Sequence, residues 1–196
     1  MIIIPRKPRI WYPGATYHIM SRGNRKQNIF KSNEDYSMFL QIIKSTQQKF
    51  PFILHSYCMM TNHIHLQIET KDIDIGKIMS IILKKYTDYY NSKYEYVGHL
   101  FQGRYKSILI ENDSYFLQTN RYIHLNPYKA NMVSNPVDYK FSSYHIYANN
   151  QKSDIVTTSF TLNYFNNNIQ KYKEFIESYI SDSSIENSIR NSLGED

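Results

Sequence analysis

Two histidines stand one residue apart in the segment TNHIHLQIE, residues 61–69. His63 and His65 share one parity of an alternating run, and the isoleucines and leucine of the run share the other. In a β-strand, successive side chains point to opposite faces, so both imidazoles would emerge side by side on the polar face. Neighbouring imidazoles can hold a divalent metal ion, although such a pair can also form a solvated or hydrogen-bonded surface.

Tyr122 and Asn126 stand four residues apart in the segment 113–126, where the spacing of apolar residues predicts a helix. Residues four apart share one face of a helix, so the phenol and the amide would project together. Two neutral imidazoles and one amide oxygen would give three ligands for a divalent cation and leave positions open for a phosphate oxygen. A tyrosine there could attack the phosphate, provided that the site helps it to lose its proton, since its ordinary pKa is about 10. These residues indicate metal-assisted chemistry, with nucleic acid as one candidate substrate.

Each of these residues also has an ordinary structural interpretation. Tyr122 is one of 19 tyrosines, most of which must serve packing. Asn126 precedes Pro127, and proline disfavours helical geometry in the residue before it, so the helix is expected to end at Asn126. Arg121 should point about 100° away from Tyr122 around the helix, so we do not assign it to the site. We interpret His124, for which the sequence offers no partner, as structural.

The strands and helices that would position these residues are indicated by local periodicity. Alternating patterns bounded by turn residues predict four strands, over residues 14–23, 52–60, 61–69 and 103–112. Apolar residues at helical spacing predict three helices, over residues 33–50, 74–94 and 113–126. Asn33 is the expected N-cap of the first helix.

The predicted order of elements is β-α-β-β-α-β followed by a helix. This is the split βαβ pattern of a ferredoxin-like α+β sandwich with an antiparallel sheet. The two crossover helices would cover the sheet face to which the apolar residues of strand 61–69 point. The helix that carries Tyr122 would then lie across the other face, beside the two histidines.

The charge of the chain is unevenly distributed. Residues 1–150 hold 19 Lys and Arg against 10 Asp and Glu, whereas residues 151–196 hold 4 against 7. The excess of basic residues over 1–150 favours a polyanionic partner, most often nucleic acid, although a solvated basic surface would have the same excess of Lys and Arg.

Cysteine content and hydropathy exclude several other classes of protein. Cys58 is the only cysteine, so the sequence has no disulfide framework and no cysteine-based zinc site. No apolar run is long enough for a signal-peptide core or a membrane span. We therefore expect a cytoplasmic, nucleoid-associated protein with no membrane partner.

Candidate DNA contacts lie in the N-terminal segment, after the first strand and at the start of the fourth strand. These segments combine cations with aromatic or amide side chains, a composition suited to phosphate contact and base stacking. A soluble arm or ordinary polar loops are the alternative interpretation. The candidate residues are Arg6, Lys7, Arg9, Trp11, Arg22, Asn24, Arg25, Lys26, Arg104 and Lys106.

Five blocks of the sequence together resemble a known family. They are SRGNRKQNIF (21–30), CMMTNHIHL (58–66), GHLFQGRYKS (98–107), RYIHLNPYKA (121–130) and DYKFSSYHIY (138–147). In this order and spacing the chain resembles the REP-associated tyrosine transposases. These are a branch of the single-tyrosine HUH transposases, named for two histidines around a hydrophobic residue, and are related to small insertion-sequence transposases.

The resemblance implies a role for each candidate residue. Tyr122 would be the nucleophile, and His63, His65 and Asn126 would bind Mg²⁺ or Mn²⁺. The activity implied is endonuclease and strand-transfer chemistry on single-stranded DNA at hairpin, REP-like sites through a 5′-phosphotyrosine intermediate. Such an enzyme needs no small-molecule substrate and could act as a monomer or a homodimer.

The same resemblance suggests how the chain is divided, and leaves other functions open. We expect a basic N-terminal arm over 1–12, a catalytic domain over 13–147 and a C-terminal helical extension over 148–196. The extension could cover the active site or be mobile. A non-catalytic nucleic-acid-binding protein of the same fold is one alternative function. A metallo-phosphodiesterase that uses water, with Tyr122 merely packing, is another.

Overall fold

The computed structural model describes residues 10–178 and 184–193 and contains one four-stranded sheet. The strand order is β2-β3-β1-β4, and every neighbouring pair is antiparallel. This order confirms the predicted ferredoxin-like α+β fold. The strands are β1 (Thr16–Arg22), β2 (Phe52–Met59), β3 (His63–Thr70) and β4 (Lys106–Ile110).

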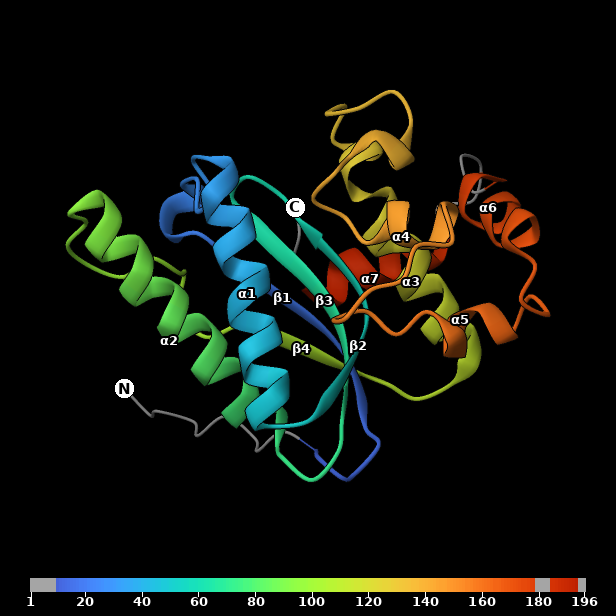
Figure 1. The fold of residues 1–196 in the computed structure, drawn as a ribbon, viewed down its shortest axis with the longest axis horizontal. Helices are drawn as coiled ribbons and strands as arrows, with labels where there is room; N and C mark the ends of the chain where they lie inside the picture. Colours follow the sequence, from blue (N-terminus) through green and yellow to red (C-terminus); the bar gives the residue numbers. More distant parts are fainter. Residues whose placement is uncertain (1–9, 179–183, 194–196) are drawn as a thin grey trace.

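Helices cover both faces of this sheet (Figure 1). Two long helices, α1 (Asn33–Lys49) and α2 (Ile75–Tyr94), lie side by side on one face. The helix α3 (Asp113–Lys129) lies across the other face. The remaining helical segments are the 3₁₀ turns η1 (Asn24–Lys26) and η2 (Pro136–Asp138) and the helices α4 (Tyr144–Ala148), α5 (Ser159–Asn163), α6 (Ile169–Glu177) and α7 (Ser184–Leu193).

The alternation of β3 separates an apolar face from a polar one, as the sequence predicted. Ile64, Leu66 and Ile68 are fully buried in the main hydrophobic core, which also contains the inner faces of α1 and α2. His65 and Gln67 point the other way and are fully buried as well, on the face that α3 covers. The face with the histidines is therefore the one opposite α1 and α2.

The N-cap of α1 is Ser32, so the prediction of Asn33 was wrong. Ser32 has extended backbone geometry and forms a capping box with Asp35: its side chain accepts from the Asp35 N–H, and the Asp35 carboxylate accepts from the Ser32 N–H. This reciprocal pair satisfies two donors that the helix itself cannot, which an asparagine one position later would not do.

The predicted end of α3 before Pro127 was also wrong, because the helix continues to Lys129. Proline lacks an N–H donor and its ring crowds the carbonyl of the residue four positions earlier, but it does not prevent later residues from bonding. The next turn still closes, since the N–H of Ala130 donates to the carbonyl oxygen of Asn126 at 3.0 Å. Asn126 therefore has a full helical turn on both sides, which fixes the direction of its side chain. The strand predicted over 103–112 is shorter than expected, because Gly103 has a left-handed φ of +66° in the turn before it.

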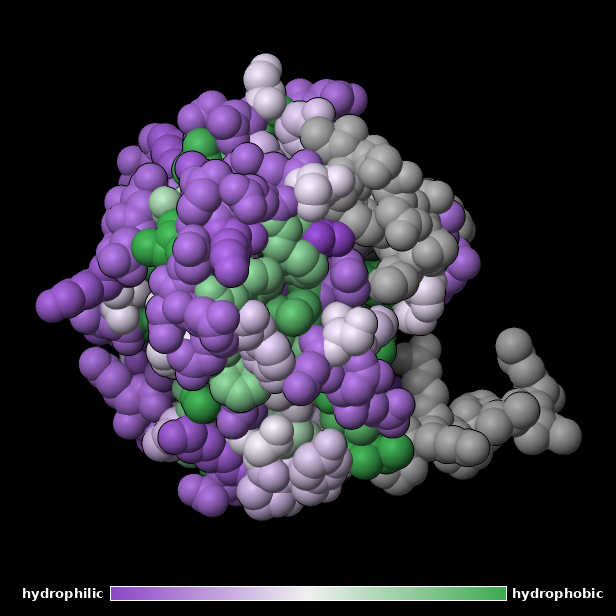
Figure 2. Space-filling view, turned by 90° about the vertical axis from the view of Figure 1, so that its right-hand side faces the viewer, coloured by the Kyte–Doolittle hydropathy of each residue, from purple (hydrophilic) through white to green (hydrophobic). Residues whose placement is uncertain are grey.

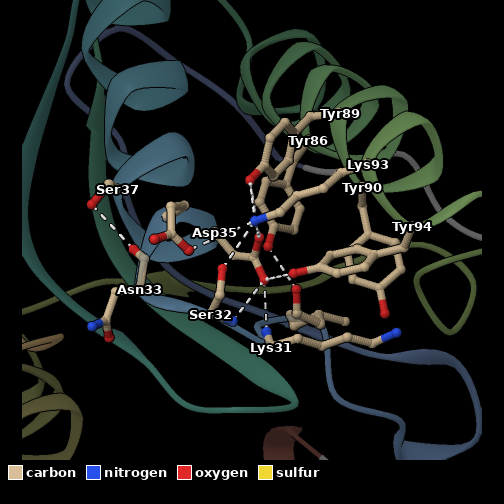
Figure 3. Close-up of polar contacts among 12 residues, drawn as sticks. Lys31, Ser32, Asn33, Asp35, Ser37, Tyr86, Tyr89, Tyr90, Lys93 and Tyr94 are labelled. Atoms are coloured by element: carbon tan, nitrogen blue, oxygen red, sulfur yellow. Dashed lines mark hydrogen bonds and ion pairs between the residues drawn. The ribbon is translucent and has the colours of Figure 1, made fainter.

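A single buried carboxylate joins the start of α1 to the end of α2 (Figure 3). Asp35 accepts hydrogen bonds from Lys93 Nζ at 2.7 Å and from the hydroxyls of Tyr89 and Tyr94 at 2.9 and 2.8 Å. It also accepts from the backbone N–H of Lys31 at 2.7 Å. Burial alone would raise the pKa of Asp35, but these hydrogen bonds outweigh it and lower the pKa to about 2.

The last helices pack on the side of the molecule away from α1 and α2 (Figure 1). Tyr172 and Ile176 of α6 are fully buried in the main core. Figure 2 faces this side and shows hydrophilic residues over most of it, with apolar residues gathered in a limited patch near its centre. Within the described ranges, no helix combines the length and apolar composition that crossing a membrane requires.

We predict that Asp35→Asn lowers the free energy of unfolding by about 2–4 kcal/mol at pH 7, because it leaves a lysine and two tyrosines without their charged acceptor. Since the folded-state pKa lies below the ordinary value, this contribution is present above about pH 4 and is lost as the pH falls toward 2. Urea unfolding followed by circular dichroism measures both effects.

Asp88→Asn is the matched control, since Asp88 pairs with Lys84 on the exposed face of α2. We expect almost no change from it. Equal stability of the two variants would contradict the structural role given to Asp35.

Candidate active site

The two histidines of β3 lie side by side on the face that α3 covers. Their ring centroids are 5.0 Å apart and the rings are nearly perpendicular. In the antiparallel register, Arg22 of β1 is opposite His63, and Met20 of β1 and Cys58 of β2 are opposite His65. Directly opposed residues share a face, so the guanidinium-bearing Arg22 lies next to the histidine pair.

Tyr122 and Asn126 of α3 lie over this pair within the same chain. The ring centroid of Tyr122 is 5.6 Å from that of His65, and Tyr122 is only 5% exposed. One turn further along, the amide nitrogen of Asn126 donates to the Tyr122 carbonyl oxygen at 3.2 Å, and the Asn126 side chain also hydrogen-bonds to His63. The structure thus brings the four predicted residues together, while their roles as ligands and nucleophile stay predictions.

The Nδ1 atoms of both imidazoles are engaged by the protein. His63 Nδ1 lies 2.6 Å from Oδ1 of Asn62, and His65 Nδ1 lies 3.1 Å from Nε2 of His18 on β1. The Nε2 atoms are therefore the ones suited to bind a cation. Sequence reasoning did not propose His18 or Asn62 for the site. The position of His18 follows from the β1–β3 register, which alternation within one strand does not reveal.

Burial keeps both imidazoles neutral. It lowers the pKa of His63 to about 4, with a further contribution from the positive charge of Arg22. The pKa of His65 also lies well below its ordinary value, mainly through burial and then because a charged His65 would be repelled by His63, His18 and Arg22. A neutral imidazole is the form that binds metal, so the site needs no deprotonation at pH 7.

The donor set fits a divalent cation bound by two nitrogens and one oxygen. His63 and His65 would supply the nitrogens and Asn126 the amide oxygen. Across the described parts of the chain, no three His, Cys, Asp or Glu side chains gather as a metal site. Asn126 as the third ligand stays what the family resemblance implies.

A buried polar network holds α3 on the sheet. The amide of Asn120 donates to Gln67 of β3 at 3.2 Å, and the hydroxyl of Tyr172 of α6 donates to the Asn120 oxygen at 2.6 Å. The same hydroxyl lies 2.7 Å from Nδ1 of His124, whose Nε2 lies 2.8 Å from Oγ of Ser143. All five residues are fully buried. Asn120 and His124 are each two residues from Tyr122, so the network fixes the rotation of α3 at the candidate nucleophile.

Arg121 and His124 lie as the sequence predicted, away from the histidine pair. The guanidinium carbon of Arg121 is 3.6 Å from the ring centroid of Phe175 of α6. His124 belongs to the buried network and has a structural role.

Two basic loops lie together at the end of β1, next to His63. The N–H of Asn24 donates to the carbonyl oxygen of Leu100 at 2.8 Å. The N–H of Gln102 donates to the carbonyl oxygen of Arg22, also at 2.8 Å. These bonds place Arg104 in the loop adjoining η1. Arg25 and Lys26 of η1 are exposed and have left-handed φ angles of 53° and 59°. The candidate DNA contacts gathered here are Arg22, Asn24, Arg25, Lys26 and Arg104.

The other candidate DNA contacts are spread over the molecule. Lys106 of β4 is opposite Met20 and so shares the face of the histidines. Trp11 is half-buried and packs against the main core, so its base-stacking role stays a prediction. Arg6, Lys7 and Arg9 lie outside the described residues.

The helix α7 lies beside the candidate nucleophile. Ile189 and Leu193 of α7 belong to the same buried cluster as Tyr122. The ammonium of Lys106 donates to the Leu193 carbonyl oxygen. Residues 184–193 therefore pack against the cluster that contains Tyr122, while a role of the C-terminal extension in covering the active site stays a prediction.

Together, the fold and site define a class: a ferredoxin-like sheet with a histidine pair on its polar face and a tyrosine helix packed across it. The model of the IS200-like transposase family matches residues 12–126, more than half of the chain. The chain therefore belongs to the family of IS200-like transposases. The sequence has no match among the curated proteins with which it was compared.

This chain is similar to solved structures. A REP-associated tyrosine transposase bound to a REP hairpin superposes with a TM-score of 0.64 at 20% identity, over 79% of this chain and 92% of that one. A proposed transposase from Deinococcus radiodurans R1 gives a TM-score of 0.43 at 13% identity, over 76% of this chain and 99% of that one. The first match confirms the fold predicted from the resemblance.

We predict that Tyr172→Phe lowers the free energy of unfolding by about 1–3 kcal/mol, because it leaves Asn120 and His124 buried without their shared hydroxyl. Urea unfolding measures the change. Tyr12→Phe is the control, since Tyr12 is 48% exposed. If both variants were as stable as the wild type, the buried network would not hold α3.

Proposed function

We propose that this transposase cleaves and rejoins single-stranded DNA at hairpin sites, with Tyr122 as the attacking group. The observation that carries the proposal is the position of Tyr122, whose ring lies 5.6 Å from that of His65 while Asn126 contacts His63. A merely packing tyrosine would not need a paired imidazole and an amide on the same side.

The bonds exchanged in this reaction balance without an external energy source. The phenol of Tyr122 loses its proton and its oxygen forms a bond to phosphorus. The bond from phosphorus to the 3′ oxygen breaks, and that oxygen takes up one proton and leaves as a free 3′ hydroxyl, so no net proton is gained or lost. The product is a 5′-phosphotyrosine ester. Because a phenolate is a good leaving group, the 3′ hydroxyl can later attack this ester and restore the strand.

His63, His65 and Asn126 would hold Mg²⁺ or Mn²⁺, as the family resemblance implies. When bound, the cation would withdraw charge from the phosphate as the phosphorus becomes five-coordinate. Arg22 lies opposite His63 and supplies a fixed positive charge on the same face. It would orient the phosphate toward Tyr122 through a charge-assisted hydrogen bond.

The loops around η1 and Arg104 would bind the backbone of the hairpin. The similar structure named above is bound to a REP hairpin, which supports a DNA hairpin as the substrate class. Arg25 and Lys26 are exposed beside the histidine pair, so phosphates held there would lead the strand toward Tyr122.

We predict a covalent protein–DNA adduct when labelled hairpin DNA is incubated with the protein and Mn²⁺, and none after chelation with EDTA. Tyr122→Phe should lose the adduct by at least about 1000-fold, because it lacks the attacking oxygen. Denaturing gel electrophoresis measures the adduct. Tyr115→Phe, on the same helix, is the control and should retain it.

The same experiment separates the competing functions. Hairpin binding without an adduct in the wild type would leave a binding protein only. Cleavage that persists in Tyr122→Phe would identify water as the nucleophile.

We predict that hairpin affinity falls steeply between about 50 and 200 mM salt, because neutralised phosphates release their counterions. Lys26→Ala should reduce the slope of log affinity against log salt by about 1. Fluorescence anisotropy measures both. Lys84→Ala, on the exposed face of α2, should leave the slope unchanged. An affinity that hardly varies with salt would rule out the basic loops as the DNA site.

A further inference from the structure

His18 is a buried histidine on β1 that the proposed reaction does not use. In the β1–β3 register it is opposite Gln67, so it shares the face of the histidine pair. It is fully buried, and its Nε2 lies 3.1 Å from Nδ1 of His65. At this distance one ring donates a hydrogen bond to the other, so the direction of the bond and the tautomer of His65 are coupled.

Metal binding through His65 would require one direction of this hydrogen bond. His65 can offer the lone pair of Nε2 only when its proton is on Nδ1. His18 Nε2 is then the acceptor, and His18 carries its own proton on Nδ1. Within the described part of the chain, His18 Nδ1 has no hydrogen-bond partner, so the bond to His65 is the polar contact that orients the His18 ring.

The partner of His63 shows the same arrangement with an unambiguous direction. Oδ1 of Asn62 can only accept, so the 2.6 Å contact puts the proton of His63 on Nδ1. The Nε2 of His63 then carries a lone pair, which is the form that binds a metal ion. Asn62 thus contacts Nδ1 of His63, and His18 contacts Nδ1 of His65. Partners of this kind fix the tautomer and orientation of metal-binding histidines.

His18 also contacts the candidate nucleophile. Its ring centroid is 5.3 Å from that of His65 and 5.7 Å from that of Tyr122, and the His65 and Tyr122 centroids are 5.6 Å apart. The three rings form a nearly equilateral triangle. A shift of the His18 ring would therefore displace both the candidate ligand His65 and the candidate nucleophile Tyr122.

We propose that His18 is a positioning residue that accepts the Nδ1 proton of His65, directs the His65 Nε2 to the metal and supports the ring of Tyr122. This inference rests on the proposed metal-dependent function and deepens it. His18 does not touch the substrate or the cation. It acts through His65.

The test measures Mn²⁺ binding to the full chain without DNA, by electron paramagnetic resonance of the free ion. His18→Leu removes the acceptor, and we expect affinity to fall by about 10-fold to 100-fold. His18→Gln places an amide near the position of Nε2 and should stay close to wild type. His18→Asn carries the same amide on a shorter side chain and should behave like His18→Leu. His55→Leu replaces an equally buried histidine of β2, which is hydrogen-bonded to Glu69 of β3, and should leave affinity unchanged.

A second readout addresses the tautomer directly. In ¹H–¹⁵N correlation spectra of the metal-free protein, we expect His65 to carry its proton on Nδ1 in the wild type and in His18→Gln. In His18→Leu and His18→Asn, the Nε2–H form should become populated. A role of His18 in packing alone would not change this signal. If His18→Leu does not fold, the comparison of the two amide variants decides.

The outcomes for the metal site and for His18 are distinguishable. Equal Mn²⁺ affinity and an unchanged His65 tautomer in His18→Asn and His18→Gln would overturn the role of His18 and leave the metal site intact. Absence of Mn²⁺ binding by the wild type, or binding that survives His63→Ala, would overturn the metal site and this inference with it. Loss in His18→Asn that is restored in His18→Gln would support it.

Discussion

The arrangement of the candidate site depends on the buried hydrogen bonds that hold α3 on the polar face of the sheet. Apolar contacts would hold a helix there, but they tolerate rotation and sliding. Buried amide and hydroxyl groups do not, because each loses free energy if it leaves its partner. The contacts of Asn120 with Gln67 and Tyr172 therefore specify one register for α3. In that register, Tyr122 lies over His65 of its own chain.

Because side chains alternate along β3, one face of the sheet forms the apolar core and the other carries the candidate site. Ile64, Leu66 and Ile68 face α1 and α2, whose ends are joined by the buried carboxylate of Asp35. That layer stabilises the fold. The opposite face can then carry buried imidazoles, which would be costly without partners. The partners come from β1, from the turn before β3 and from α3, so the site is assembled from several segments of the chain.

Much of this arrangement follows from patterns within single elements. Alternation placed His63 and His65 on one face, and helical spacing placed Tyr122 and Asn126 together. The sequence did not reveal His18, because its position depends on how β1 pairs with β3. The prediction that α3 ends before Pro127 was wrong, because the N–H of Ala130 still donates to the Asn126 carbonyl oxygen across the proline. Composition could not show that Ile189 and Leu193 of α7 pack beside Tyr122, since an amphipathic helix fits several surfaces.

The most direct test of this account is a crystal structure of the protein with Mn²⁺ and a hairpin oligonucleotide, with an anomalous difference map recorded at the manganese edge. The account predicts one peak bounded by Nε2 of His63, Nε2 of His65 and the amide oxygen of Asn126, with the phenol oxygen of Tyr122 facing a phosphate of the same complex. A peak elsewhere, or a phenol turned away from the phosphate with α3 still in place, would contradict it.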